Sequence, residues 1–256
     1  MTDETMVGRQ LAGDIDLAAA LRLIGVGEIE VVGRLVSASN ATLFCRVAIP
    51  DGPDGGPLVG TCIYKPVRGE APLWDFPEGT LAARERAAYL VSEASGWRIV
   101  PPTVLRDGPF GVGMVQLWVD VDEAVDPVDL VNDADARLRR IAIFDAIVNN
   151  GDRKVGHLLP RPDGLICGVD HGVCFNTDPK LRTVLWAWRG KRLRRVEVAE
   201  VEALRAALDA DLGAALAEVL AADEVALTRR RADALLEGGR FPMPPSDRPA
   251  IPWPPY

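Results

Sequence analysis

Cysteine, histidine and lysine are all scarce in this chain of 256 residues: there are four cysteines, two histidines, and four lysines against 25 arginines. The cysteines are scattered and form no CxxC motif, which argues against a disulfide scaffold and fits a reducing compartment. No apolar run approaches the 18 or more residues of a membrane-spanning helix. The first ten residues are polar and acidic, unlike a secretory signal. We therefore expect a cytoplasmic protein.

Basic charge is also in deficit, since the formal net charge is −8. This acidic balance disfavours a general nucleic-acid binder, which must neutralise phosphates. The sequence contains neither GxxxxGK[ST] nor a GxGxxG motif after a strand, which excludes P-loop and Rossmann sites. Neither a nucleic-acid partner nor a membrane partner is expected.

The first 118 residues predict a sheet with helices. A helix over 14–24 has Asp14 or Asp16 as N-cap and Gly25 as its stop signal. Alternating β-branched residues predict strands, and turn residues such as those at 51–57 separate them. The expected strands are a hairpin within 29–49, a strand over 58–67, and two further strands over 100–105 and 113–119. A helix over 80–95, capped by Thr80, lies between the third and fourth strands, so the sheet should be five-stranded and antiparallel.

The rest of the chain is mainly helical in pattern. Residues 120–135 are acidic and loop-like, and a strong helix follows over 136–148. Two short strands come next, and residues 197–236 predict two helices rich in Ala, Leu and Glu. The tail over 241–256 has seven prolines in sixteen residues, so it should be extended or disordered. We expect an N-lobe over 1–118, a C-lobe over 119–240 and this Pro-rich tail.

Two aspartates carry the most chemical information. Asp152 follows a helix in the sequence NNGDRKVGH, and Asp170 ends a short strand in GVDHG. Both histidines of the chain, His157 and His171, fall within these two segments. Upstream, Lys65 ends a predicted strand and is followed by a helix that carries acidic residues. Side chains at the exits of helices and strands are where active-site groups commonly lie.

The order of these features resembles the atypical branch of the protein-kinase-like fold, which includes phosphatidylinositol kinases and bacterial toxin-type serine/threonine kinases. Asp152 and Arg153 match the DR of its DRxxxN catalytic loop, and Asp170 stands where the DFG aspartate would be. The stretch FDAIVNNGDRKVGHLL is similar to actinobacterial phosphatidylinositol-kinase-like proteins. The resemblance spans about residues 29–190. It implies an α+β, two-lobed fold with a sheet-rich N-lobe and a reduced, mainly helical C-lobe.

The resemblance also implies roles in phosphoryl transfer from ATP. Lys65 would bind the ATP phosphates, Glu85 would orient Lys65, and Asp152 would position the acceptor hydroxyl. Glu93 competes with Glu85 for the pairing role. Mg²⁺ or Mn²⁺ would be held by two residues, His157 and Asp170. The nucleotide would contact residues of a hairpin turn and of the end of the last N-lobe strand: Ser37, Ser39, Asn40, Gln116, Trp118 and Val119.

Two positions depart from the family pattern. His157 stands where the branch often has Asn, and His171 replaces the Phe of DFG. Imidazole suits softer divalent ions than Mg²⁺, so His157 indicates either an altered metal preference or weakened activity. A zinc site made by Cys167, His171 and Cys174 is disfavoured, because the spacing matches no common zinc motif.

A basic segment follows the second aspartate. Residues 180–195 hold seven basic residues and no acidic one. The segment is either a solvated face or a dock for an anionic acceptor, with Trp186 and Trp188 flanking a groove.

Together these observations predict a kinase. The reaction expected is ATP-dependent phosphotransfer to a hydroxyl of a protein Ser/Thr or of a small polar metabolite, and the acceptor can be anionic. The alternatives are a pseudokinase that binds nucleotide as a scaffold, an AMP transferase on the same fold, and a metal-dependent hydrolase that uses the two aspartates and the two histidines.

Overall fold

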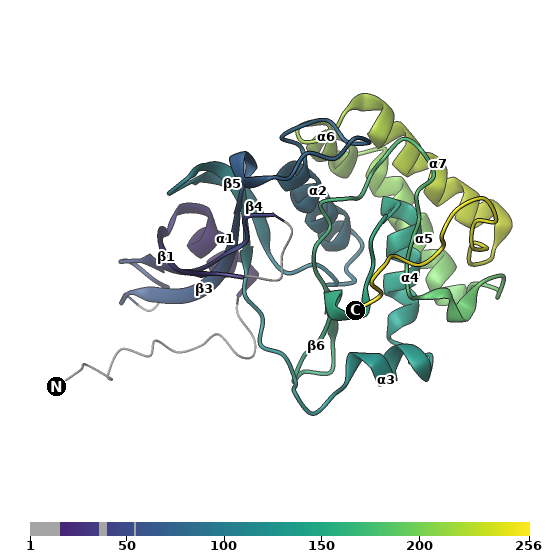
Figure 1. Ribbon diagram of the computed structural model, residues 1–256, viewed down its shortest axis with the longest axis horizontal. Helices are drawn as coiled ribbons and strands as arrows, with labels where there is room; N and C mark the ends of the chain where they lie inside the picture. Colours follow the sequence, from purple (N-terminus) through teal and green to yellow (C-terminus); the bar gives the residue numbers. More distant parts are fainter. Residues whose placement is uncertain (1–15, 36–39, 54) are drawn as a thin grey trace. The chain divides into compact units, whose positions relative to one another are not determined.

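The structure is a computed structural model that describes residues 16–35, 40–53 and 55–256. The chain divides into two compact units. The first consists of Met1–Arg86 and Pro101–Asp120, and the second of Ala87–Val100 and Val121–Tyr256. Figure 1 labels the helices and strands of both units. No helix among the described residues is long and apolar enough to cross a membrane.

The first unit is built on a five-stranded antiparallel sheet, as predicted. Its strands lie in the order β1-β2-β3-β5-β4. The bounds are Glu28–Arg34 for β1, Leu43–Ile49 for β2, Leu58–Pro66 for β3, Thr103–Gly108 for β4 and Gly111–Leu117 for β5. The last two strands begin and end a few residues away from the predicted positions, because Pro101 and Pro102 delay β4 and the β-turn lies at Gly108–Gly111, with Pro109 and Phe110 at its centre.

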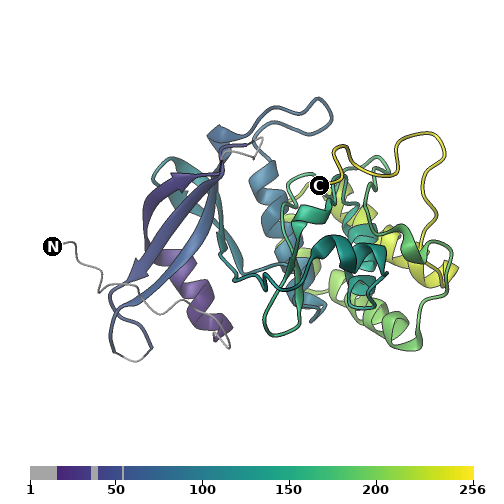
Figure 2. The same cartoon turned by 60° about the horizontal axis from the view of Figure 1, so that its bottom comes forward.

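Helix α1 (Leu17–Val26) packs on one face of this sheet, as Figure 2 shows. Asp16 caps the helix by accepting a hydrogen bond from the backbone N–H of Ala18, so one of the two predicted caps is confirmed. The predicted stop at Gly25 is wrong, because the helix continues to Val26. Gly27 ends it: a Cβ at this position would lie 2.4 Å from the carbonyl oxygen of Leu23.

The core of the first unit lies between α1 and the sheet. Leu23 and Ile24 of α1 are completely buried there against residues of β2 and β3. Cys45 and Cys62 face each other across these two strands, also completely buried, as thiols. Free cysteines behave as small apolar residues, so burial in a hydrophobic core is their usual position.

Helix α2 (Leu81–Ala94) is confirmed, but its N-terminus is capped differently from the prediction. The two carboxylate oxygens of Glu70 accept hydrogen bonds from the backbone N–H groups of Leu81 and Ala82, at 3.1 and 2.8 Å. The hydroxyl of Thr80 is directed to the carbonyl oxygen of Pro77 instead. Glu70 therefore acts as a cap from eleven residues upstream, which the local sequence pattern could not reveal.

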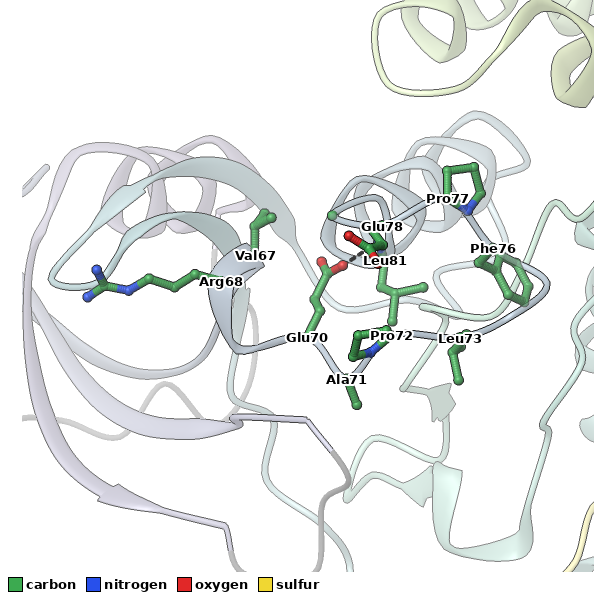
Figure 3. A pocket seen from close by; sticks show the side chains of 11 residues that line it. Val67, Arg68, Glu70, Ala71, Pro72, Leu73, Phe76, Pro77, Glu78 and Leu81 are labelled. Atoms are coloured by element: carbon green, nitrogen blue, oxygen red, sulfur yellow. Dashed lines mark hydrogen bonds between the residues drawn. The ribbon is translucent and has the colours of Figure 1, made fainter.

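Figure 3 shows the small pocket that surrounds this capping carboxylate. The loop between β3 and α2 forms most of its wall, with the first residue of α2 on one side. Its lining residues are Val67, Arg68, Glu70, Ala71, Pro72, Leu73, Phe76, Pro77, Glu78, Gly79 and Leu81. Within this pocket the Glu70 carboxylate already accepts the hydrogen bonds of the first backbone N–H groups of α2. The main effect of Glu70 is therefore to fix the start of α2.

The second unit is mainly helical. Its elements are α3 (Pro127–Asn132), α4 (Leu138–Val148), β6 (Leu158–Pro160), β7 (Ile166–Gly168), α5 (Arg195–Leu208), α6 (Asp211–Ala217) and α7 (Ala222–Gly238). The strands β6 and β7 form an antiparallel hairpin. Two sequence expectations were wrong here. The loop-like stretch 120–135 contains α3, which Asp126 caps and Pro127 begins. The region 197–236 holds the larger part of three helices instead of two.

The Pro-rich tail over 241–256 is extended, as one of the two expectations had it, and it packs on the second unit. Phe241 is buried, and the carbonyl oxygen of Ala250 accepts hydrogen bonds from the backbone N–H of Thr183 and the indole Nε1 of Trp186. The carbonyl oxygen of Pro255 accepts a hydrogen bond of 2.9 Å from the backbone N–H of Val155. Figure 1 shows the end of the tail next to the segment that leads into β6.

Candidate active site

The first unit holds the predicted lysine and glutamate side by side. Lys65 lies near the end of β3, and its Nζ is 2.6 Å from Oε1 of Glu85 on α2. The Glu85 side chain is almost completely buried, whereas the Lys65 side chain keeps 16% of its surface exposed. Glu93, the rival for this pairing, lies in the last turn of the helix, where its carboxylate is 3.4 Å from the hydroxyl of Tyr89. The lysine therefore pairs with Glu85, and its ammonium stays partly accessible.

Residues at the end of β5 differ in how accessible their side chains are. Gln116 is buried and donates a hydrogen bond of 2.8 Å to the hydroxyl of Thr103, so its side chain serves the sheet. Trp118 is partly exposed and packs edge-on against Phe44 at 5.0 Å between ring centroids. Val119 is half-buried. Of these three residues predicted to contact the nucleotide, only Trp118 and Val119 have solvent-exposed surface.

The hairpin turn predicted to cover phosphates is only partly described. Ser37 and Ser39 lie outside the described residues. Asn40 is half-buried, and its Oδ1 accepts a hydrogen bond of 2.8 Å from the backbone N–H of Ala71. Asn40 thus joins this turn to the loop that leads into α2, a structural role the sequence did not indicate.

In the second unit, Asp152 follows the end of α4. The helix stops at Asn149, which adopts a left-handed backbone conformation with φ of 54°. The Asp152 side chain keeps 26% of its surface exposed, and its Oδ2 lies 3.2 Å from Nζ of Lys154. Burial raises the pKa of Asp152 above its ordinary value, and nearby Asp170 adds to this effect, while Lys154 and Arg182 oppose it. Asp152 is therefore a carboxylate held among charges of both signs.

Asp170 and His157 come together beside this carboxylate. The Nε2 of His157 lies 3.5 Å from Oδ2 of Asp170, and nearly half of the Asp170 side chain is exposed. Pairing of β6 with β7 brings them close, because the backbone N–H of Val169 donates to the carbonyl oxygen of His157. Asp170 has a φ of 61°, in the left-handed region that residues with a Cβ rarely adopt. The two predicted metal ligands are thus neighbours in the structure.

Arg153, the second residue of the DR motif, is buried. Its side chain is completely buried and forms an ion pair with Asp145 of α4, at 2.9 Å. Asp145 was not recognised as a site residue in the sequence. One signal was present: it is the single charged residue in the otherwise apolar run 141–148. A charge on the buried face of a helix requires a partner.

The basic segment over 180–195 does not form one continuous groove. Arg182 lies by the Asp152 loop, where its Nε donates a hydrogen bond of 2.7 Å to the carbonyl oxygen of Gly151. Trp188 is buried near Phe241, and Trp186 is half-buried and bonded to the tail, so the two tryptophans do not flank an open groove. Lys180 is half-buried, and its backbone N–H donates a hydrogen bond of 2.8 Å to Oδ1 of Asn149. The other five cations are exposed near the start of α5: Arg189, Lys191, Arg192, Arg194 and Arg195.

Within the residues that the structure describes, no group of three or more His, Cys, Asp or Glu side chains could hold a metal ion. His157 and Asp170 supply two ligands at most. Cys167 and Cys174 are buried, and burial raises the pKa of the Cys167 thiol. A divalent ion at this place would need further oxygen ligands, and kinase-type sites obtain them from the nucleotide phosphates.

Comparison with known proteins relates the chain to one family and, over half its length, to a lipid kinase. No protein-family model matches it. The protein Rv2133c of Mycobacterium tuberculosis is 44% identical over 265 residues, covering 90% of this chain and 93% of that protein. Phosphatidylinositol 4-kinase gamma 4 of rice is 29% identical over 157 residues, covering 54% of this chain and 28% of that protein. The crystal structure of the proinflammatory kinase CtkA of Helicobacter pylori aligns with a TM-score of 0.47 and 11% identity, covering 84% of this chain and 94% of CtkA.

The two sequence matches confirm the resemblance to phosphatidylinositol-kinase-like proteins that the motifs indicated. The chain is an α+β protein with a five-stranded antiparallel sheet and a helical C-terminal region. It belongs to the same family as Rv2133c, a protein of an actinobacterium.

Proposed function

We propose that this protein is an ATP-dependent phosphotransferase that acts on a hydroxyl group. The observation that carries the proposal is the cluster in the second unit, where Asp152 and its partner Lys154 lie next to the pair His157 and Asp170. A carboxylate, an ammonium and a two-residue metal site are the parts that phosphoryl transfer to a hydroxyl requires. Similarity over half of the chain to a protein named as a phosphatidylinositol 4-kinase supports the same reaction.

In this proposal the first unit binds the nucleotide phosphates. The partly accessible ammonium of Lys65 provides the positive charge, and the buried carboxylate of Glu85 holds it in place. Trp118 and Val119, which directly follow β5, provide surface for the base. Ser37, Ser39 and Asn40, which lie between β1 and β2 in the sequence, would offer hydroxyl and backbone N–H groups to the phosphates.

Asp152 receives the hydroxyl. Its carboxylate accepts the hydrogen bond of the acceptor O–H and takes the proton as the oxygen attacks the terminal phosphorus of ATP, while ADP leaves. A pKa raised by burial makes Asp152 a better proton acceptor than an ordinary aspartate. The ammonium of Lys154, 3.2 Å away, neutralises charge on the phosphoryl group as it is transferred.

The residues present fit a divalent cation that arrives with the nucleotide. Asp170 and His157 would supply one carboxylate oxygen and one imidazole nitrogen, and the ATP phosphates would supply the remaining ligands. When bound, Mg²⁺ or Mn²⁺ would neutralise the phosphate charge. The positive contribution of such an ion would also relieve the repulsion between Asp152 and Asp170.

The acceptor in this proposal is a protein Ser/Thr or a small polar metabolite. Arg182 lies close enough to Asp152 to act on its charge, so an acceptor with an anionic group near its hydroxyl would be favoured. We assign the preference for an anionic acceptor to Arg182 and Lys154, because the exposed arginines near the start of α5 lie in a different part of the second unit.

A transfer assay with ATP labelled at either the α- or the γ-phosphate, in Mg²⁺ and in Mn²⁺, tests the proposal. We expect the γ-label to be transferred. Asp152→Ala should abolish transfer while nucleotide binding persists, and Asp170→Ala should lose metal-dependent nucleotide binding. Asp163→Ala is the matched control, because Asp163 forms an exposed ion pair with Arg161 in the same unit.

The other outcomes identify the alternatives. Transfer of the α-label would identify an AMP transferase, and nucleotide binding without any transfer would identify a pseudokinase. Tight metal binding in the absence of nucleotide, measured by elemental analysis of the purified protein, would favour a metal-dependent hydrolase. Normal phosphate transfer by both aspartate variants would rule out the proposed roles.

A further inference from the structure

The completely buried carboxylate of Asp145 on α4 has no part in the chemistry proposed above, yet it accepts hydrogen bonds from several side chains. Asn150 donates its Nδ2–H to it at 3.0 Å, and Arg153 donates from Nε and Nη2 at 3.0 and 2.9 Å. The hydroxyl of Thr183 is 3.5 Å away. Helix α4, the Asp152 loop and the segment after Asp170 therefore meet at this one side chain.

One connection runs from Asp145 to Asp152. The side chain of Asn150 is completely buried between the two residues. Its Nδ2 donates to the Asp145 carboxylate, and its Oδ1 accepts a hydrogen bond of 2.9 Å from the backbone N–H of Asp152. A single amide therefore transmits the position of Asp145 to the backbone of the proposed base.

A second connection runs through Arg153 to both neighbours of Asp170. Its Nη1 donates to the carbonyl oxygen of Val169 at 3.0 Å, and its Nη2 is 2.6 Å from Nε2 of His171. A guanidinium can only donate, so this imidazole nitrogen accepts. Gly168 leaves the space that Arg153 occupies: a Cβ there would lie 3.1 to 3.3 Å from the guanidinium.

The backbone at Asp170 explains why such a connection is needed. A left-handed conformation at a residue with a Cβ costs energy and persists only where the surroundings impose it. Arg153 bonds to the residue before Asp170 and to the residue after it, so it holds this conformation from both sides. A buried ion pair is a poor source of stability compared with apolar packing, which makes geometric control the more natural function of this one.

We propose that Asp145 is a positioning residue that sets the backbone of Asp152 through Asn150 and the backbone of Asp170 through Arg153. This inference rests on the proposed phosphotransfer, because it assigns Asp145 to the same site. In this proposal Asp145 contacts neither the nucleotide nor the acceptor. Its effect on the reaction is exerted through the two connections, which can be broken separately.

Three variants and one control test this. Asp145→Asn removes the charge at the centre while keeping the size of the side chain. Asn150→Ala breaks only the connection to Asp152, and Gly168→Ala forces a Cβ against the guanidinium of Arg153. Asp135→Asn is the control, since Asp135 forms a partly exposed ion pair with Arg137 in the same unit.

The two connections predict different kinetic effects. Asn150→Ala should lower kcat by at least about ten-fold with nucleotide KM nearly unchanged, because misplacing a reacting group by about 1 Å can cost about a hundred-fold in rate. Gly168→Ala should mainly raise the KM for metal–ATP, because it disturbs Asp170. Asp145→Asn should show both effects, and Asp135→Asn should show neither. A merely structural role would lower the melting temperature without this division between kcat and KM.

Two measurements that need no turnover accompany the kinetics. Hydrogen exchange of the Asp152 backbone amide should be faster in Asp145→Asn and Asn150→Ala than in the wild type or the control. The ¹⁵N resonances of the His171 ring should move in Asp145→Asn and Gly168→Ala, and with only two histidines in the chain they can be assigned simply.

The outcomes separate this inference from the proposed function. Wild-type kcat, KM and amide exchange in Asp145→Asn and Asn150→Ala would overturn the positioning role. If Asp145→Asn does not fold, Asn150→Ala decides: a lower kcat at a native melting temperature supports the role, and wild-type kcat overturns it. If the wild type transfers no phosphate from ATP, the proposed function fails, and the exchange and ¹⁵N measurements alone decide whether Asp145 sets the two backbones.

Discussion

Two ion pairs, one in each unit, contrast in their burial. The pair of Lys65 and Glu85 in the first unit has a buried carboxylate and an ammonium that keeps 16% of its side-chain surface exposed. The pair of Arg153 and Asp145 in the second unit has no exposed surface at all. The first pair joins a strand to a helix, with Nζ of Lys65 2.6 Å from Oε1 of Glu85, whereas the second is part of a network that reaches two loops.

The difference in burial indicates which of the two pairs can also bind a ligand. An accessible ammonium can bind a phosphate without leaving its glutamate, because its three donors point in different directions. A guanidinium that is completely buried and bonded on all sides can bind no ligand, so its effect is limited to the shape of the backbone around it. The first pair is therefore suited to binding and the second to positioning, and the predictions below test this contrast.

The largest expected effect comes from breaking the buried pair. Arg153→Met should lower the free energy of unfolding by about 3–5 kcal/mol, because it leaves the Asp145 carboxylate buried without its cation. Urea denaturation followed by circular dichroism measures this. Arg137→Met, which breaks a partly exposed pair in the same unit, should change the stability by no more than about 1 kcal/mol. Equal effects of the two substitutions would contradict the contrast.

Breaking the accessible pair should affect binding more than folding. Lys65→Ala should weaken nucleotide binding at least about ten-fold, which corresponds to about 1.4 kcal/mol, with a smaller loss of stability than Arg153→Met. Isothermal titration with ATP and a divalent metal checks this, with circular dichroism as the test of folding. Unchanged nucleotide affinity would remove Lys65 from the site.

The metal preference should depend on His157. An imidazole ligand favours Mn²⁺ over Mg²⁺, and an amide oxygen suits Mg²⁺, so His157→Asn should shift the ratio of Mg²⁺ to Mn²⁺ activity several-fold toward Mg²⁺. His157→Ala should lose most activity with either metal. If the wild type and His157→Asn have the same ratio, His157 only packs against the loop that carries Asp170.

A smaller effect is expected from the charge on Asp152. Its pKa is raised in the folded protein, so the ionised form costs stability once the pH rises through that pKa. Asp152→Asn should therefore raise the melting temperature at neutral pH, on the order of 1–3 °C, while abolishing transfer. The gain should shrink as the pH falls below the pKa of Asp152, where the wild-type carboxyl is protonated. Thermal unfolding between neutral and mildly acidic pH measures both the sign and the trend.

The smallest effect is expected from the exposed arginines near the start of α5. Replacing Arg192, Arg194 and Arg195 together by Ala should change the stability by about 0.5 kcal/mol or less. Their effect on the acceptor KM and on its salt dependence should be weaker than that of Arg182→Ala, because Arg182 lies by Asp152. A larger KM effect of the triple variant would restore the whole segment over 180–195 as a docking surface.

The sequence predicted what depends on local pattern. Period-two alternation revealed the strands of the sheet. The pairing of Lys65 with Glu85 was an implication of the family resemblance, and the structure places the two side chains 2.6 Å apart. It did not reveal the cap that Glu70 provides to α2, because the two lie eleven residues apart and the local signal pointed to Thr80. Helix α3 was missed in an acidic stretch whose Asp-Pro start is a helix signal in hindsight.

In the candidate site, the sequence singled out residues that keep some exposed surface, but not the buried residues Asp145 and Asn150 behind them. Asp152, His157 and Asp170 stand in recognisable motifs, whereas Asp145 and Asn150 act through buried bonds that only the tertiary structure reveals. The charge of Asp145 within the otherwise apolar run 141–148 was a usable sign that a buried partner exists. Which residue that partner is could not follow from the sequence, since Arg139 and Arg140 lie closer along the chain than Arg153.

The packing of the tail has a practical consequence for anyone who produces the protein. Because Pro255 bonds to Val155, two residues before His157, an affinity tag or fusion partner joined after Tyr256 would begin beside the segment proposed to bind metal. A polyhistidine tag there would bring metal-binding imidazoles to that place and could imitate or obscure the native preference between Mg²⁺ and Mn²⁺. Preparations intended for metal or activity measurements are therefore better tagged before residue 16, or freed of a C-terminal tag by proteolysis.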